Sequence, residues 1–289
     1  MIGSYPAGPP FLFLNDLFMN GVCRGQSHSE KKLRSSIIII HAEVGIIKLT
    51  MENNKFFGIT HIGLVRKSNE DRYLIKKLED KSVLVAVADG LGVEVAGHYA
   101  AEILRNKLAD LNHISKKNEQ PELDQLARVM DHTIYTEGQE NNTLEGMGST
   151  LVGVLLRDRI AYWVHVGDSR LYLLRNGTLT QVTEDQTLAR FLLEEGEITA
   201  EQMPTHYSRH VMDQCLGCGF VEPETGRLDF LAGDLLVLST DGLHREIPEN
   251  TLKSILNMDT NLEIKARALV EAALGAGGKD NITVVMAQG

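Results

Sequence analysis

The alternating stretch from Ser149 to Leu179, STLVGVLLRDRIAYWVHVGDSRLYLLRNGTL, does most to limit the folds open to this chain. Apolar and polar residues alternate along it, which is the period of half-buried β-strands. Turn residues interrupt it at 157–159 and at Asn176-Gly177. An Asn-Gly pair between two alternating segments is a strong hairpin signal. The stretch therefore predicts a meander of antiparallel strands.

The remaining segments place this meander inside one α+β domain. Further strands are predicted at 57–62, 71–77, 82–89, 233–241 and 280–288. Helices are predicted at 96–112, 121–141, 187–195, 248–257 and 261–275. Hairpin-linked strands with helices inserted between them favour an antiparallel α+β architecture over a βαβ repeat. No internal repeat or low-complexity linker divides this region.

The first part of the chain has a different character. Residues 1–55 lack a clean helical or strand period until the alternation that starts at Phe56. We expect a peripheral N-terminal extension at 1–55 and a folded domain at 56–289. An alternative is an over-long start assignment, with translation beginning near Met51.

Composition excludes several classes of function. The 289 residues carry a formal net charge of −10, whereas a broad nucleic-acid surface needs Lys and Arg in excess. No apolar run approaches the roughly 18 residues of a membrane span, and the N-terminal apolar segment lacks the basic start of a secretion signal. We therefore expect a cytoplasmic protein that binds neither nucleic acid nor membrane.

The chain has three cysteines, Cys23, Cys215 and Cys218. An odd and small number does not make a disulfide framework, and it fits a reducing compartment. Cys215 and Cys218 have CxxC spacing, but no second pair or nearby His completes a zinc site. A structural or incidental role is favoured here over metal or redox chemistry.

Acidic residues recur where the predicted strands begin or end. Two apolar strands end in Asp-Gly, and acidic residues flank two others or lie in the meander: Asp89-Gly90, Asp241-Gly242, Glu70-Asp71, Asp280 and Asp168. A single Asp-Gly after a strand is usually a turn. If these strand ends converge, the carboxylates repel one another unless divalent cations lie among them. Oxygen ligands favour Mg²⁺ or Mn²⁺ over zinc.

Such a cluster suits the hydrolysis of phosphate esters. A glycine after the aspartate lets its carbonyl approach a metal ion. A pair of ions can hold a bridging hydroxide for in-line attack on phosphorus. Arg66, four residues before Glu70, is a candidate to hold the phosphate, because its planar fork matches phosphate oxygens. A solvated surface arginine is the alternative.

Taken in order, these motifs resemble the metal-dependent serine/threonine protein phosphatases of type 2C, and most of all their compact bacterial members. The resemblance covers roughly residues 56–288. It rests on Arg66, Asn69-Glu70-Asp71-Arg72, Val87-Ala88-Asp89-Gly90-Leu91-Gly92, Gly148-Ser149-Thr150, Gly167-Asp168-Ser169-Arg170, Thr183-Glu184-Asp185, Ser239-Thr240-Asp241-Gly242-Leu243 and Asp280-Asn281-Ile282-Thr283.

The resemblance implies a fold and a set of roles. The fold is a central sandwich of two antiparallel sheets flanked by helices, α-β-β-α, with a two-metal centre at one end. Asp89 bridges two Mn²⁺ or Mg²⁺ ions, and the Gly90 carbonyl ligates one. The other ligands are Asp241, Asp280, Glu70 and Asp71. Arg66 grips the phosphate, and a metal-bridging hydroxide attacks phosphorus with no phosphoenzyme intermediate.

The chain departs from the family pattern at several positions. Val93, Glu94, His98 and the Gln186-Thr187 pair replace the residues that the family usually has there. Bacterial members often bind a third ion through the aspartate equivalent to Asp168 and an acid in a flap. Here Met203 stands near the expected acid, and Glu201 is the available substitute. Residues 196–204 form much of the predicted flap.

The predicted function is hydrolysis of phosphoserine and phosphothreonine in proteins by a monomer. The substrates of a Ser/Thr kinase are the expected partners, as the resemblance implies. One alternative is a regulatory pseudophosphatase that binds phosphoproteins without catalysis, and another is a hydrolase of small phosphorylated metabolites. A structural or surface role is favoured for His98 and His206, the two histidines that could approach the site. His206 is a candidate acid for the leaving group, with metal-bound water the favoured alternative.

Overall fold

The computed structural model describes residues 44–47, 55–92 and 95–289, and only the backbone of 44–47. One sheet has the strand order β1 (Val44–Ile47), β2 (Phe56–His61), β13 (Ile282–Gln288), β12 (Leu235–Ser239), β9 (Arg170–Arg175) and β10 (Thr178–Gln181). The other has the order β11 (Glu224–Asp229), β8 (Ile160–Val166), β7 (Leu151–Arg157), β4 (Val83–Ala88) and β3 (Arg72–Lys77). A short ribbon pairs β5 (Gly90–Leu91) with β6 (Gly148–Ser149). Every pairing is antiparallel.

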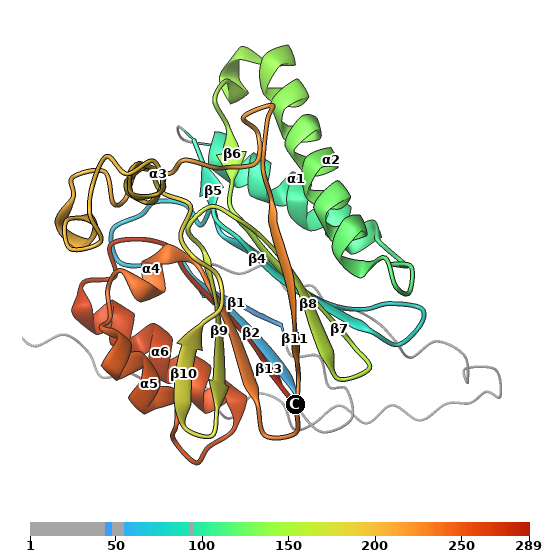
Figure 1. Ribbon diagram of the computed structural model, residues 1–289, viewed down its shortest axis with the longest axis vertical. Helices are drawn as coiled ribbons and strands as arrows, with labels where there is room; N and C mark the ends of the chain where they lie inside the picture. Colours follow the sequence, from blue (N-terminus) through green and yellow to red (C-terminus); the bar gives the residue numbers. More distant parts are fainter. Residues whose placement is uncertain (1–43, 48–54, 93–94) are drawn as a thin grey trace, which may run out of the picture. The chain divides into compact units, whose positions relative to one another are not determined.

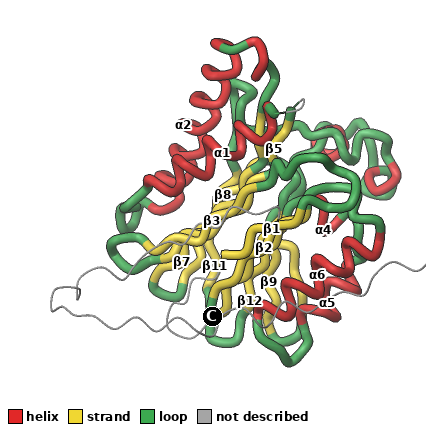
Figure 2. Tube along the Cα trace, turned by 180° about the vertical axis from the view of Figure 1, so that it is seen from behind, coloured by secondary structure: helices red, strands yellow, loops and turns green. Residues whose placement is uncertain are grey.

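Helices cover the outer face of each sheet (Figures 1 and 2). Helices α1 (Ala96–Asp110) and α2 (Glu119–Glu140) pack on the β4 sheet. On the β12 sheet lie α4 (Asp241–His244), α5 (Glu249–Leu256) and α6 (Leu262–Ala276). Helix α3 (Leu188–Glu194) lies in the long segment between β10 and β11. This arrangement confirms the predicted α-β-β-α sandwich.

Apolar patterning explains the three hydrophobic clusters of the core: one between the two sheets, and one between each sheet and its helices. Strand β4, VLVAVA, is buried on both faces, because α1 covers one face and the second sheet covers the other. Val85 and Val87 point into the core between the sheets, and Leu84 and Ala86 point toward the helices. In α6, Leu262, Ala266, Leu269 and Ala273 form a buried stripe with helical spacing. Truncating Leu269 to Ala is expected to cost about 2–5 kcal/mol of stability.

Three features differ from the segments expected from the sequence. Strand β11, ETGRLD, was not predicted, because it is a half-exposed edge strand without apolar alternation. Asp241 begins a short helix, α4, instead of ending a strand. Strand β1 pairs with β2 although it precedes residue 56. The boundary at 55/56 stays a prediction, since residues 1–43 and 48–54 lie outside the described residues, as do Val93 and Glu94.

Within the described ranges, no helix has both the length and the apolar content needed to cross a membrane.

Candidate active site

A pocket of about 250 Å³ collects the strand-end acids that were predicted from the sequence. They come from the β2–β3 connection, the end of β4, the β8–β9 connection, the start of α4 and the segment just before β13. Five carboxylates and two arginines are among its lining residues: Arg66, Glu70, Asp89, Gly90, Leu91, Gly92, Asp168, His210, Met212, Asp241, Arg245, Asp280 and Asn281. Of the other predicted residues, Asp71 is buried and Glu201 is exposed, and neither is part of this lining.

Two hydroxyl residues clamp the backbone of Asp89 just after β4. The Asp89 amide donates to Thr150 Oγ1 at 3.0 Å, and its carbonyl accepts from the Thr150 amide at 2.9 Å and Ser149 Oγ at 3.1 Å. Thr150 Oγ1 also shares a hydrogen bond of 2.7 Å with Ser169 Oγ. These contacts fit the structural role that was expected for the two motifs, because they fix the strand end that carries the aspartate.

Gly90 is required by close backbone packing. A Cβ at this position would lie 2.1 Å from the Gly97 carbonyl oxygen and 2.9 Å from the Glu70 carbonyl oxygen. Both distances are shorter than real Cβ contacts, and the first is far shorter, so a side chain would push α1 or the Glu70 loop away. Glycine at position 90 therefore allows the backbones of Gly97 and Glu70 to pack closely beside Asp89.

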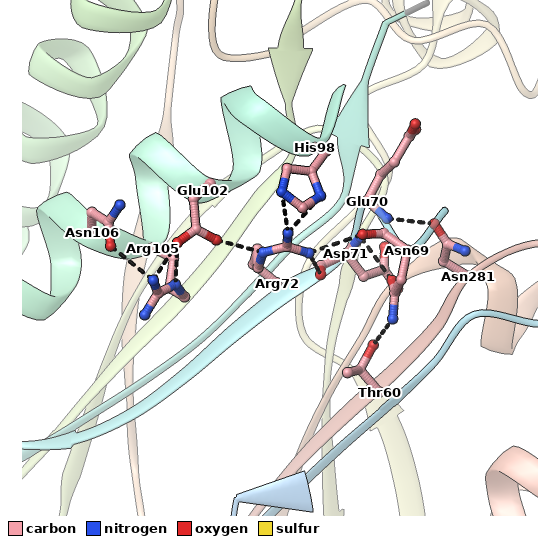
Figure 3. A network of polar contacts seen from close by, with 10 residues as sticks. All are labelled: Thr60, Asn69, Glu70, Asp71, Arg72, His98, Glu102, Arg105, Asn106 and Asn281. Atoms are coloured by element: carbon pink, nitrogen blue, oxygen red, sulfur yellow. Dashed lines mark hydrogen bonds and ion pairs between the residues drawn. The ribbon is translucent and has the colours of Figure 1, made fainter. Parts of the chain in front are cut away.

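Asn281 and Arg72 hold the loop that presents Glu70 and Asp71 (Figure 3). Asn281 Oδ1 accepts from the Glu70 amide at 2.8 Å, and its Nδ2 donates to the carbonyls of Ile62 and Ser68. Arg72 Nη1 donates to the Asp71 carbonyl at 2.6 Å, and its Nε donates to Glu102 at 2.6 Å.

His98, one of the departures from the family pattern, belongs to this support. Its ring contacts Arg72 Nη2 at 2.7 Å (Figure 3), and it does not line the pocket. Burial acts to raise the pKa of Glu102, but hydrogen bonds from Arg105 and Arg72 outweigh it and lower this pKa to about 2. Arg72 is therefore held by a carboxylate one helical turn after His98.

Asp71 is a buried carboxylate that forms no ion pair with any of the described residues. Its Oδ2 accepts hydrogen bonds from Thr240 Oγ1 at 2.8 Å and Thr283 Oγ1 at 2.6 Å. Its Oδ1 is buried and has no hydrogen-bond partner. Burial raises the pKa of Asp71 to about 7, and the charges of Asp241 and Asp280 add to the rise.

Burial and mutual repulsion dominate the electrostatics of the pocket. Burial, followed by the charges of Asp71 and Asp241, raises the pKa of Asp89 well above its ordinary value. Burial also raises the pKa of Asp241, and it raises that of Asp168 to about 6. Carboxylates that resist ionisation in this way are stabilised by added positive charge.

Two arginines on the rim supply part of that charge. Arg66 Nη2 lies 2.7 Å from Asp280 Oδ2, with about half of its side chain exposed. Arg245 contacts Asp168 at 2.5 Å and Asp241 at 2.7 Å. Arg245 was not predicted from the sequence as a site residue. Its position four residues after Asp241 was the available clue, because such a pair shares one helix face.

The remaining donors fit divalent metal ions. Cations such as Mg²⁺ and Mn²⁺ prefer carboxylate and carbonyl oxygens, and this pocket offers no other kind of acidic donor. The buried Oδ1 atoms of Asp71 and Asp241 have no hydrogen-bond partner among the described residues. A bound cation would satisfy both oxygens. As the side chains stand in the described residues, no three His, Cys, Asp or Glu form a metal-binding group; Arg66 and Arg245 pair with three of the carboxylates instead.

The predicted flap residues are less closely tied to the pocket. Glu201 is exposed, and a hydrogen bond from Thr199 lowers its pKa. His206 pairs with Ser208 at 2.7 Å and does not line the pocket, whereas His210 does. Burial, followed by the charges of Arg245 and Arg209, lowers the pKa of His210. A third ion held by Asp168 and Glu201 stays a prediction.

Fold and pocket together define a phosphatase-like α-β-β-α sandwich with an acidic centre at one end. A family model described as "Protein phosphatase 2C" matches residues 61–272. The chain belongs to this family, which confirms the resemblance seen in the sequence.

Named relatives agree with this assignment. The serine/threonine protein phosphatase PstP of Mycobacterium tuberculosis is 37% identical over 226 residues, covering 78% of this chain and 43% of the relative. This chain therefore spans less than half of that protein. The serine/threonine phosphatase stp of Listeria monocytogenes is 33% identical, covering 79% of this chain and 93% of the relative.

A solved structure shares the fold. The crystal structure of the PstP catalytic domain in complex with two manganese ions superposes with a TM-score of 0.71 at 34% identity. It covers 81% of this chain and 96% of that one.

Proposed function

We propose that this chain is a metal-dependent protein serine/threonine phosphatase. The observation that carries the proposal is the meeting of Glu70, Asp89, Asp241 and Asp280, from four separate segments, around one pocket with Arg66 on its rim. The names of the relatives support the same activity. The full set of expected acids is present, which favours catalysis over a pseudophosphatase.

Six groups would hold two Mn²⁺ or Mg²⁺ ions: Glu70, Asp71, Asp89, the Gly90 carbonyl, Asp241 and Asp280. When bound, the ions supply an activated water and neutralise charge on the phosphate. The chain's part is to fix these donors: Thr150 and Ser149 hold Asp89, Asn281 holds the loop of Glu70, and Thr240 and Thr283 orient Asp71. Fixed donors need little rearrangement during reaction, which is the main advantage of such sites.

Arg66 binds the substrate phosphate. Its guanidinium is half exposed at the pocket rim, and Asp280 holds it from one side. The remaining donors of its planar fork are free to bind two phosphate oxygens. Arg245 positions Asp168 and Asp241, because its two ion pairs oppose the repulsion between these carboxylates.

The substrates are phosphorylated proteins, and a Ser/Thr kinase supplies them. The enzyme acts as a cytoplasmic monomer with Mg²⁺ or Mn²⁺, and Asp168 with Glu201 is the candidate place for a third ion. The names of the relatives, which are serine/threonine phosphatases, support the substrate class.

Initial rates with a phosphothreonine peptide test the activity. We expect hydrolysis with added Mn²⁺ or Mg²⁺ and its loss in excess EDTA, with recovery when the metal is restored. Folded protein that is inactive with both metals would contradict the proposal, and so would full activity in the chelator.

Competing substrates separate the remaining possibility. A set of phosphorylated metabolites should give kcat/KM values well below those of phosphoserine and phosphothreonine peptides. The reverse order would identify a small-molecule phosphatase on the same metal centre.

A further inference from the structure

The CxxC pair is a reactive feature that the proposed phosphatase chemistry leaves unused. The sulfur atoms of Cys215 and Cys218 lie 2.6 Å apart, close to the covalent S–S length of about 2.05 Å. Cys218 is exposed and Cys215 is partly exposed, and both are free thiols. A small reagent therefore has access to a pair of sulfurs that already touch.

The backbone around the pair holds it in this geometry. Asp131, a buried residue of α2, accepts hydrogen bonds from the amides of Gly217 at 2.7 Å and Gly219 at 3.2 Å. Gly217 has φ +105°, and a Cβ there would lie 2.5 Å from the Met147 carbonyl oxygen. Only glycine fits such a turn. Because the turn is already ordered, joining the sulfurs requires little further loss of conformational freedom.

The two thiols are chemically different. A hydrogen bond from the Cys215 thiol lowers the pKa of Cys218 to about 7, and the same hydrogen bond raises the pKa of Cys215. A thiol whose pKa lies near the ambient pH is the most effective attacking group in disulfide exchange. Cys218, the more exposed of the two, is therefore the nucleophile, and Cys215 is the resolving thiol.

The residue between the cysteines connects them to the active-site wall. Leu216 is fully buried and exchanges two backbone hydrogen bonds of 2.9 Å with Ser149. Ser149 pairs with Gly90 in the β5–β6 ribbon, and its Oγ donates to the Asp89 carbonyl. A displacement of the CxxC turn is thus transmitted to the strand end that carries Asp89.

We propose that Cys215 and Cys218 are a redox-active dithiol that small-molecule disulfides oxidise to an intramolecular disulfide, and that this slows the phosphatase. The Cys218 thiolate attacks one sulfur of the reagent, forms a mixed disulfide and releases one thiolate. Cys215 then gives up its proton and attacks the Cys218 sulfur, which expels the second thiolate. Two protein thiols are oxidised, and one reagent disulfide is reduced to two thiols.

Mass spectrometry after treatment with glutathione disulfide tests the chemistry in a Cys23→Ser background, where only the pair can react. We expect the loss of two hydrogens without retained glutathione. Cys215→Ser should trap a glutathione adduct on Cys218, and Cys218→Ser should react roughly tenfold more slowly, because its remaining thiol is less exposed and burial still raises its pKa. Equal reaction rates of the two single variants, or a stable adduct on the parent protein, would overturn the assignment.

The effect on rate rests on the proposed phosphatase function and is measured separately. The oxidised protein should be two- to tenfold slower, which is the usual range for coupling through a few contacts. Dithiothreitol should restore the rate, and the Cys215→Ser/Cys218→Ser double variant should not respond to glutathione disulfide. A closed disulfide with an unchanged rate overturns the coupling. A reduced protein without phosphatase activity overturns the proposed function instead, while the mass result still decides the dithiol.

Discussion

Two clusters of buried charge lie at opposite ends of strand β7. At its far end, Arg157 is buried and donates to Asp80 at 2.6 Å, to Glu119 at 2.8 Å and to the Ile114 carbonyl at 2.7 Å. This cluster contains both signs of charge. Burial acts to raise the pKa of Asp80, but hydrogen bonds from Ser82 and the charge of Arg157 lower it overall.

At the near end, Thr150 precedes β7 and holds the backbone of Asp89, in an acidic cluster that Arg66 and Arg245 neutralise only in part. Asp71 is buried and Asp89 is half-buried, both have raised pKa values, and the two arginines of the pocket lining sit on the rim. At one end of β7, a buried cation is paired with two acids. At the other end, several acids have too few cations to neutralise them. We therefore interpret the Arg157 cluster as one that stabilises the fold, and the acidic cluster as a binding site for a cationic ligand.

Replacing Asp89 with Asn should have the largest effect. Loss of this central carboxylate is expected to lower kcat by about a thousandfold or more, because the donors to both proposed ions are disrupted. Stability without metal should not fall, since one repelling charge is removed. Initial rates with a phosphopeptide and Mn²⁺, together with thermal melting, check both expectations. A rate within tenfold of the parent protein would remove Asp89 from the proposed centre.

Arg157→Met should lower stability without lowering the catalytic rate, which is the reverse of the result expected for Asp89→Asn. It leaves the buried carboxylate of Glu119 without its cation, and the more exposed Asp80 loses the same partner. Breaking such a buried pair costs about 3–5 kcal/mol of unfolding free energy. The rate per folded molecule should be unchanged. Urea denaturation gives the stability, and rates at a temperature where the variant is folded give the activity.

Lys116→Met is the matched control for Arg157→Met. Its ion pair with Asp158 is largely exposed, at 66% and 73% of the side chains, so its removal should change stability by less than about 0.5 kcal/mol. If both variants lose the same stability, burial of the Arg157 cluster is not what stabilises it.

Metal binding should stabilise the folded protein only through the acidic cluster at the Thr150 end of β7. At an Mn²⁺ concentration of a hundred times its Kd, a single site adds about 2.7 kcal/mol to the unfolding free energy. Arg157→Met should gain as much as the parent protein, and Asp89→Asn should gain far less. Denaturation with and without Mn²⁺ measures the gain, and an equal gain in Asp89→Asn would place the ion elsewhere.

The two clusters also differ in how far the sequence predicts them. Asp89 and Asp241 were found because each follows an apolar strand and precedes glycine, which is a local pattern. Arg157 was not, since tertiary packing brings Asp80 and Glu119 to it. Arg245 has one local partner, Asp241, but its other partner, Asp168, lies 77 residues before it. The antiparallel sandwich followed from hairpins and alternation in the same local way.

The smallest expected effect is the response of the Arg157 cluster to acid. A carboxyl whose folded pKa is lowered contributes stability above its ordinary pKa near 4, and this contribution is lost as the pH falls through the folded value. Asp80 therefore contributes to acid sensitivity below about pH 4. Asp80→Asn should flatten the fall of Tm between pH 4 and pH 2 while leaving the phosphopeptide rate at neutral pH unchanged. An identical acid profile in the variant would mean that Arg157 is held by Glu119 and the Ile114 carbonyl alone.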